Sequence, residues 1–463
     1  MKGKNNKLSQ TGWLTGIVLL VLLLLHALPP LQWREHALRR VDLLSDVRPS
    51  KPEPVAEADT TLPPPPRPKP AFVDTCRTGM TCIEDYSDST LRGMTPFYRA
   101  LDGLATHRRP VRIAYLGDSF IEADILTADL REMLQRHYGG CGVGFVPITS
   151  ATNQFRPTVR HDFDGWESHA AMDSLGFDRH LQGLSGQYFL PSDGAYVELR
   201  GQKQYASLLD TCRRASIFFR VYGGGHLTLS ARVNRGQAVT RTFRPSDAVQ
   251  QMVVEGAIGE VRWTVVQADS TVFYGAAMDG TEGIVLDNFS LRGSTGLSLR
   301  NIPMETLRHF NALRPYDLIV LQYGLNVAHE EVSNYAYYAT GMRPVLDSLK
   351  LAFPSAGILV VGVGDRDYKD EGGTLRTMPC IKQLVRYQQH MAAGNAVAFW
   401  NLYEAMGGEA SMARLVEANP PQANLDYTHI NFHGGRYVAG LIYDVLVYGK
   451  QQYDRRRAYE DGL

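Results

Sequence analysis

The sequence predicts an α/β fold in which a parallel sheet with helices on both faces is interrupted by an inserted, jelly-roll-like β-sandwich. In two stretches of the chain, short apolar runs typical of buried strands alternate with helical patterns, as in a parallel sheet. Between these stretches, from residue 142 to residue 285, strand-like segments and turn residues alternate without a long helix, which favours a sandwich. The 463 residues, of which 44% are apolar, suffice for more than one folded unit.

The first 30 residues have the composition of a short cytoplasmic tail followed by a signal anchor. Lys2, Lys4 and Lys7 precede the apolar stretch Trp13–Leu28, which would measure roughly 24 Å as a helix. This length is slightly short for a bilayer core of about 30 Å and suits a signal-peptide core or a short anchor. Because no small-x-small cleavage site is visible, we expect a retained anchor in the inner membrane and an exported, periplasmic body. A buried helix of a soluble domain is the alternative.

Residues 31–75 form a proline-rich segment without a core-forming pattern. The run from Arg48 to Pro70 includes four consecutive prolines, and such composition predicts an extended, semi-rigid spacer. The spacer would hold the folded body away from the membrane.

The five cysteines do not form a metal-binding pattern. Cys76 and Cys82 bracket a short loop that could close as a disulfide in an oxidising compartment. Cys141, Cys212 and Cys380 are expected to be unpaired thiols, and no ligand spacing typical of zinc is present. We therefore expect no metal and no cofactor.

The charge balance gives no indication of a nucleic-acid partner. Lysine and arginine together number 48, and aspartate and glutamate also number 48. A nucleic-acid-binding domain usually carries a basic excess, so a functional partner has to be inferred from local sites.

The first part of the α/β domain, residues 76–141, contains a strand from Arg112 that ends in Gly117-Asp118-Ser119. An amphipathic helix is predicted to follow directly and to stop at Gly139-Gly140. Its apolar positions are Ile125, Leu126, Leu130, Met133 and Leu134. A serine at a helix start commonly does no more than cap the helix.

The insert and the second part of the α/β domain differ in their strand patterns. Within the insert, strands are predicted at Ala215–Tyr222, His226–Asn234 and Val261–Gln267. The second part, residues 286–463, continues the α/β pattern from a strand that begins just before it. The buried strands are predicted at Ile284–Gly293, Asp317–Gly324, Gly357–Gly364 and Ala396–Leu402.

Several polar residues and glycines follow these strands. Ligands of open parallel sheets bind beyond the carboxyl ends of the strands, where Ser119, Gly293 and Asn326 are expected. Asp426 and His429 lie three residues apart just before a predicted C-terminal helix. This convergence favours a functional role for Ser119 over simple capping.

Four short blocks, in this order, resemble the SGNH (GDSL-type) esterase family: "GDSF", "RGSTG", "GLN" and "DYTH". The resemblance covers roughly Arg112–Gly140 and Leu286–Tyr448 and implies a flavodoxin-like sheet. It implies that Ser119 is the nucleophile, His429 the general base and Asp426 the group that orients the imidazole. The oxyanion would bind the backbone N–H groups of Ser119 and Gly293 and the side-chain amide of Asn326.

Alternatives remain open for three of these assignments. Asn326 could cap the segment that follows its strand. His433 lies four residues beyond His429 and would share its face on a continuing helix. Gly296 could replace Gly293 as the oxyanion donor, or either glycine could serve only a turn.

Two further stretches of sequence resemble one particular group within this family. "YGLNVA" and "FWNLYEAMGG" (Phe399–Gly408), together with the interrupted domain, resemble bacterial cell-envelope carbohydrate esterases, including peptidoglycan O-acetylesterases. There the insert resembles a carbohydrate-binding module, and a lid or packing domain is the alternative. The expected function is removal of acyl groups, here O-acetyl, from an envelope glycan through an acyl-enzyme. An acetyltransferase with the same acyl-enzyme, and a glycan-binding protein with a vestigial site, are the alternatives.

Overall fold

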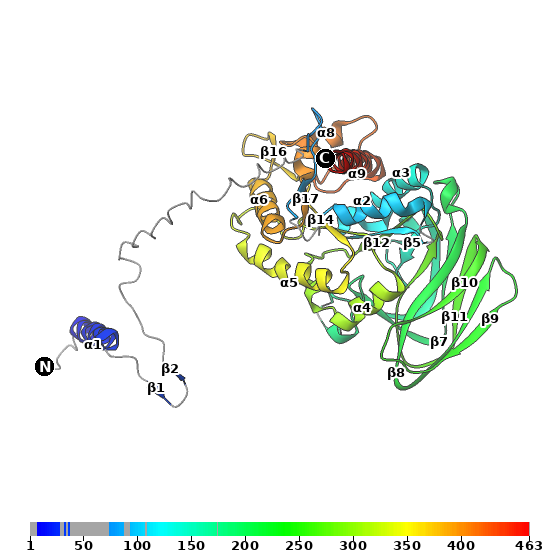
Figure 1. The fold of residues 1–463 in the computed structure, drawn as a ribbon, viewed down its shortest axis with the longest axis horizontal. Coiled ribbons are helices and arrows are strands. Elements are labelled where there is room, and N and C mark those ends of the chain that lie inside the picture. The colour runs from blue at the N-terminus through cyan, green and yellow to red at the C-terminus, as the bar shows by residue number, and fades with distance from the viewer. Residues whose placement is uncertain are drawn as a thin grey trace, which may run out of the picture. The chain divides into compact units, whose positions relative to one another are not determined.

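The computed structural model describes residues 7–27, 32–33, 36–37, 74–87, 93–106, 109–173 and 175–462. The chain divides into two units, residues 1–71 and 72–463, which are drawn in Figure 1. Within the first unit, α1 (Lys7–Ala27) is helical, as the apolar stretch predicts, and β1 (Gln32–Trp33) pairs antiparallel with β2 (His36–Ala37). The rest of the predicted spacer lies outside the described residues, apart from its C-terminal end.

The predicted membrane anchor is not supported by the described residues. Among them, no helix is both long enough and apolar enough to cross a membrane. The side chains of α1 that are described are nearly all exposed; Trp13, for example, is 74% exposed.

The second unit contains the predicted parallel sheet. Five strands run parallel, and one short strand pairs antiparallel at the edge. In spatial order they are β12 (Ile284–Ser290), β4 (Val111–Gly117), β13 (Leu318–Gln322), β14 (Gly357–Val361), β17 (Ala398–Trp400) and β3 (Glu84–Asp85). If the five parallel strands are counted along the chain, this order is 2-1-3-4-5, the order of flavodoxin-like folds.

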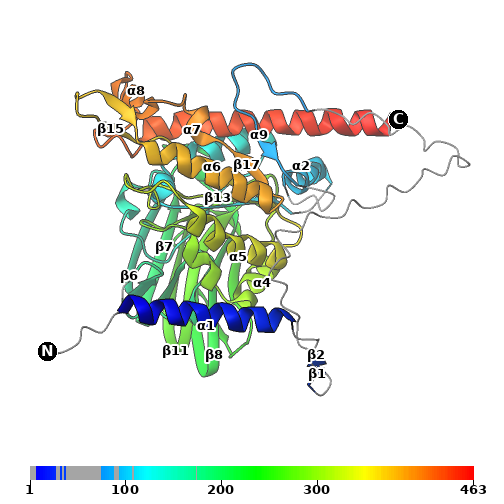
Figure 2. The same cartoon turned by 90° about the vertical axis from the view of Figure 1, so that its left-hand side faces the viewer.

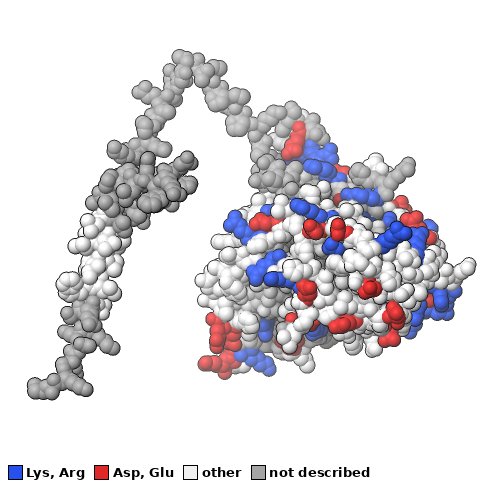
Figure 3. All heavy atoms as spheres, turned by 90° about the horizontal axis from the view of Figure 1, so that it is seen from below, with Lys and Arg blue, Asp and Glu red and all other residues white. Residues whose placement is uncertain are grey.

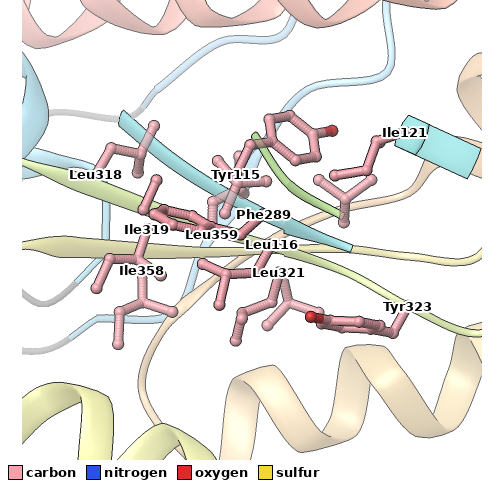
Figure 4. Close-up of a cluster of buried hydrophobic side chains, with 14 of the residues drawn as sticks. Tyr115, Leu116, Ile121, Phe289, Leu318, Ile319, Leu321, Tyr323, Ile358 and Leu359 are labelled. Carbon is pink, nitrogen blue, oxygen red and sulfur yellow. The ribbon is translucent and has the colours of Figure 1, made fainter. Parts of the chain in front are cut away.

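The parallel strands form because their apolar residues are buried on both faces of the sheet. Every residue of β4, β13, β14 and β17 is buried, as expected for a sheet that helices cover on both sides. Figure 4 shows Tyr115, Leu116, Leu321 and Ile358 within the cluster of buried apolar side chains that these strands form.

Helices cover both faces of the sheet (Figures 1 and 2). On one side, α2 and α3 pack against α9, and on the other side α5 packs against α4 and α6. Their bounds are α2 (Thr95–Asp102), α3 (Thr127–Tyr138), α4 (Met304–Leu313), α5 (Ala336–Ala352), α6 (Pro379–Gly394) and α9 (Phe432–Asp461). Smaller elements lie between β14 and α9, namely β15 (Asp367–Lys369), β16 (Leu375–Thr377), α7 (Leu402–Ala405) and α8 (Ser411–Glu417).

The insert is one seven-stranded antiparallel sheet, so a sandwich of two separate sheets is not confirmed. Its strands are β5 (Gly144–Val146), β6 (Val159–Ala170), β7 (Gln187–Gly201), β8 (Cys212–Val233), β9 (Val239–Phe243), β10 (Gln250–Ile258) and β11 (Glu260–Asp279). The two strands predicted around residue 224 are the single strand β8. Strand β9 pairs with the second half of β8, yet the ring centroid of Phe243 in β9 lies 4.8 Å from that of Phe219 in the first half of β8. The bent sheet therefore encloses its own core.

The insert is also fastened to the parallel sheet through a buried ion cluster. The guanidinium of Arg314, which follows α4, contacts Asp279 at the end of β11 at 2.5 Å and Asp287 of β12 at 2.7 Å. Tyr188, Phe218 and Tyr274 of the insert belong to the same apolar core as the parallel sheet. The insert is thus an integral part of the second unit.

Charged side chains of both signs mix on one face of the molecule. Figure 3 shows basic and acidic side chains interspersed over the face seen from below. Ion pairs of the described residues include Lys382–Glu409, which is exposed, and Arg376–Asp370, in which Asp370 is partly buried.

Candidate active site

Ser119 lies at the corner where β4 ends. Gly117 closes the strand, and a Cβ there would lie 2.9 Å from the Gln322 carbonyl oxygen, so the chain passes too closely for a larger residue. The side chain of Asp118 accepts a hydrogen bond from Phe120 N. Ser119 is 9% exposed.

The segment after Ser119 differs from the predicted continuous helix. It is a 3-10 turn, Ser119–Asp124, and α3 begins only at Thr127. Ala123 and Asp124 have positive φ angles of 51° and 61°, which an α-helix does not allow. The interruption turns the Asp124 carboxylate into the interior, where it is fully buried.

His429 and Asp426 are held in the loop before α9. Asn424 N donates to the carbonyl oxygen of His429, and Asn431 caps the helix by accepting from His433 N. Asp426 Oδ1 accepts from the backbone N–H groups of Thr428 and His429. These hydrogen bonds hold the loop, and with it the side chains of Asp426 and His429, in a fixed position.

The structure brings Ser119, His429 and Asp426 into one hydrogen-bonded chain. Ser119 Oγ lies 3.2 Å from His429 Nε2, and His429 Nδ1 lies 2.8 Å from Asp426 Oδ2. Burial opposes ionisation of Asp426, but hydrogen bonds from His429 and Thr428 keep its pKa below the ordinary value. An ionised carboxylate at Nδ1 leaves Nε2 to accept the serine proton, the geometry of acyl transfer.

His433 does not join this chain. It is exposed in the first turn of α9, and among the described residues no hydrogen bond to its ring occurs. The geometry therefore favours His429 over the alternative that the sequence leaves open.

The loop after β12 carries Gly293 in the left-handed region, with a φ angle of 79°. Leu291 N donates to the carbonyl oxygen of Gly117, which ties this loop to the strand that ends beside Ser119. Within the described residues, no hydrogen bond uses the backbone N–H of Ser119 or Gly293. A Cβ on Gly296 would lie 2.8 Å from the Tyr323 ring, so close packing accounts for that glycine.

Asn326 lies against the same loop. Its side-chain amide donates to the carbonyl oxygen of Ser294 at 3.0 Å. The amide therefore joins the segment after β13 to the loop that carries Gly293, and no side-chain cap by Asn326 occurs among the described residues.

Two acidic residues around Ser119 escaped the sequence analysis. Burial raises the pKa of Asp118 to about 6, although N–H groups of Phe120, Gly324 and Leu325 and the His429 charge oppose the rise. Asp118 thus lies near the segment that carries Asn326. The only sequence feature that could have indicated this role of Asp118 is its position directly before Ser119, at the end of a strand.

Asp124 is the second such residue, and it joins three parts of the fold. Its carboxylate accepts from Thr127 and Arg131 of α3, from Arg156 and Thr158 of the insert, and from Asn288 of β12. Burial alone would raise the pKa of Asp124, but Arg131 and Arg156 hold it well below the ordinary value. An acidic residue in a sequence usually indicates surface, so this interior role carried no signal.

Comparison with solved structures identifies the fold. A structure entitled "Peptidoglycan O-acetylesterase in action" covers 80% of this chain and 99% of its own, with a TM-score of 0.66 and 21% identity. The chain therefore shares the fold of that structure. A family two carbohydrate esterase from Clostridium thermocellum, solved with cellohexaose, aligns over 62% of this chain and 100% of its own with a TM-score of 0.27 and 11% identity. An acetyl xylan esterase aligns over 35% of this chain and 80% of its own with a TM-score of 0.27 and 16% identity.

At the level of sequence, no protein family profile matches the chain, and no curated protein sequence matches it. The resemblance that the four blocks predict therefore finds support at the level of the fold. Among the described residues, no group of three or more His, Cys, Asp or Glu side chains could hold a metal ion.

Proposed function

We propose that the protein is a serine esterase that removes acyl groups, specifically O-acetyl groups, from a glycan of the cell envelope. The observation that carries the proposal is the hydrogen-bonded chain from Ser119 through His429 to Asp426 at the carboxyl ends of the parallel strands. The SGNH-type fold shared with a peptidoglycan O-acetylesterase supports the substrate class.

In this mechanism Ser119 Oγ attacks the ester carbonyl while His429 Nε2 takes the serine proton. His429 then gives that proton to the leaving sugar oxygen, and an acetyl-enzyme remains. Water, deprotonated by His429, hydrolyses the acetyl-enzyme and regenerates Ser119. Asp426 stabilises the imidazolium in both steps, and the N–H groups of Ser119 and Gly293 with the Asn326 amide would hold the oxyanion.

We further propose that the second unit acts outside the cytoplasm. The disulfide between Cys76 and Cys82 supports this compartment, because cytosolic thiols are kept reduced. Recovery of both cysteines as free thiols from cells, trapped by rapid alkylation, would contradict the proposal.

The deciding experiment assays a soluble fragment from Thr75 onward. We expect it to release acetate from an aryl acetate and from O-acetylated peptidoglycan, with little transfer to an added sugar acceptor. Acetyl-sugar as the main product would make the protein a transferase. A folded fragment without turnover on either ester would favour a glycan-binding protein.

Replacing Asn326 by alanine should lower kcat by roughly 10²–10³-fold with little change in KM, because one preorganised oxyanion donor is lost. Steady-state kinetics on an aryl acetate measure the effect. Asn334→Ala is a matched control, since among the described residues Asn334 only accepts a hydrogen bond from Ala336 N near the start of α5. A loss confined to KM would instead make Asn326 a substrate-binding residue.

A further inference from the structure

The loop that carries His429 is also held from outside the active site. The backbone N–H of Asp367, the first residue of β15, donates to the carbonyl oxygen of Tyr427 at 3.0 Å. Tyr427 lies between Asp426 and His429 and has a φ angle of 52°, an unfavourable region for a tyrosine. A strained residue persists only where its surroundings hold it, so the position of β15 matters for the loop.

Beside Asp367 lies a second buried carboxylate, Asp365, which is fully hydrogen-bonded. It accepts from Thr377 Oγ1 at 2.8 Å, from the backbone N–H and hydroxyl of Ser411 at 2.7 and 3.0 Å, and from Arg366 N and Met412 N. Five hydrogen bonds thus hold the Asp365 carboxyl group in place.

The Asp367 carboxyl has no comparable set of donors. Only 5% of the residue is exposed, Oδ2 accepts from Ala413 N at 2.7 Å, and Oδ1 has no partner among the described residues. Burial, together with the adjacent Asp365 carboxylate, raises the pKa of Asp367 to about 7. A proton on Oδ1, donated to Asp365, would satisfy both groups, as in other carboxyl pairs that share one proton.

The other ionisable groups nearby are engaged elsewhere. The guanidinium of Arg366 donates to the carbonyl oxygen of Ala328. Glu409 pairs with Lys382 and accepts from Thr377 N, and burial raises the pKa of Tyr403, which stays neutral. Among the described residues, no ion pair joins Asp367 to a cation that would favour its charged form.

We propose that Asp367 is a positioning residue that holds the His429 loop in place while its carboxyl is protonated and donates to Asp365. When the proton leaves for solvent, the neighbouring carboxylates of Asp365 and Asp367 repel each other. Because the Tyr427 carbonyl is bonded to Asp367 N, displacement of β15 shifts the loop and draws His429 away from Ser119. The catalytic part of this inference rests on the proposed function.

The test compares the pH dependence of kcat on an aryl acetate in three variants of the full chain. The wild-type rate should fall roughly tenfold to a hundredfold between pH 6 and pH 9, the loss expected for a misplaced catalytic group. Asp367→Asn, whose amide can donate to Asp365 at every pH, should match the wild type at pH 6 and lose the alkaline decline. Asp367→Ala should be slow throughout, and Glu371→Gln, an exposed residue of the same turn, should retain the wild-type profile.

Hydrogen exchange of the amides of residues 424–430 gives a readout that needs no activity. At pH 8.5 the wild type should exchange faster than Asp367→Asn, and at pH 6 the two should agree. Parallel pH profiles and equal exchange in both proteins would overturn the positioning role. Absence of turnover with the expected exchange difference would overturn the proposed function but leave the positioning of the loop intact.

Discussion

Replacing Ser119 by alanine is expected to reduce turnover of an aryl acetate by about 10⁴-fold or more. The same loss is expected for His429→Ala, because Ser119 Oγ and His429 Nε2 share one hydrogen bond and act in the same step of the proposed mechanism. The double variant should be no slower than either single variant, since the losses of groups that act as a unit do not add. Initial rates at saturating substrate, corrected for spontaneous hydrolysis, measure the effect.

His433→Ala is the matched control for the base. His433 is exposed on α9 and lies four residues from His429, so its removal should leave the rate within about twofold, as expected for a surface change. Cooperative thermal unfolding of every variant must first show that the fold is retained. An inactive His433→Ala beside an active His429→Ala would refute the assignment.

The parallel sheet was predictable because its strands are buried on both faces. Leu318–Gln322 and Gly357–Val361 are continuous apolar runs with the exception of Gln322 and a leading glycine, and periodic helices separate the strands. Residues at the carboxyl ends of such strands converge by topology alone. For that reason the position of Ser119 and the order of the four blocks carried most of the information about the site.

The insert was harder to predict, because one long bent strand has the same sequence pattern as two short strands joined by a turn. Gly223, Gly224 and Gly225 look like a turn, yet β8 continues through them. Gly224 has a φ angle of 83°, and the partner strand β11 shifts its register between Asp269 and Thr271. Strand β8 therefore stays paired with β11 before and after the bend. A run of glycines in the sequence could indicate either such a bend or the turn of a hairpin.

The burial of certain aspartate side chains could not be predicted from the sequence either. Asp118, Asp124 and Asp367 are each at most 5% exposed, whereas aspartate in a sequence normally indicates surface. Their burial depends on donors that are distant in the sequence, such as Arg156 for Asp124 and Ala413 for Asp367. Only the folded structure brings these partners together, so single-sequence reasoning could not assign them.

Asp124 shows what the insert contributes to the serine corner. Arg156 Nε and Thr158 Oγ1 both come from the insert and both contact the Asp124 carboxylate. Asp124 ends the 3-10 turn that begins with Ser119. Removal of the insert would therefore disturb the segment that carries Ser119, so the insert cannot be treated as a detachable module.

Replacing Asp124 by alanine should lower the free energy of unfolding by about 3 to 5 kcal/mol, the usual loss when a buried ion pair is broken on one side. The side chains of Arg131 and Arg156 are 0% and 7% exposed, so both guanidinium groups would lose a carboxylate partner without gaining water. Denaturant unfolding at neutral pH measures the loss. Asp162→Ala is the control, because Asp162 is exposed and accepts only from the Tyr196 hydroxyl among the described residues.

The effect of Asp124→Ala should also depend on pH in one direction. Because the folded protein holds the pKa of Asp124 below its ordinary value, the carboxylate contributes its full stabilisation above about pH 4 and loses it as the pH falls further. The difference between wild type and Asp124→Ala should therefore be constant from pH 5 to pH 8 and shrink in stronger acid. A difference that instead grows below pH 4, or a loss no larger than that of Asp162→Ala, would show that Asp124 does not hold the insert to the serine corner.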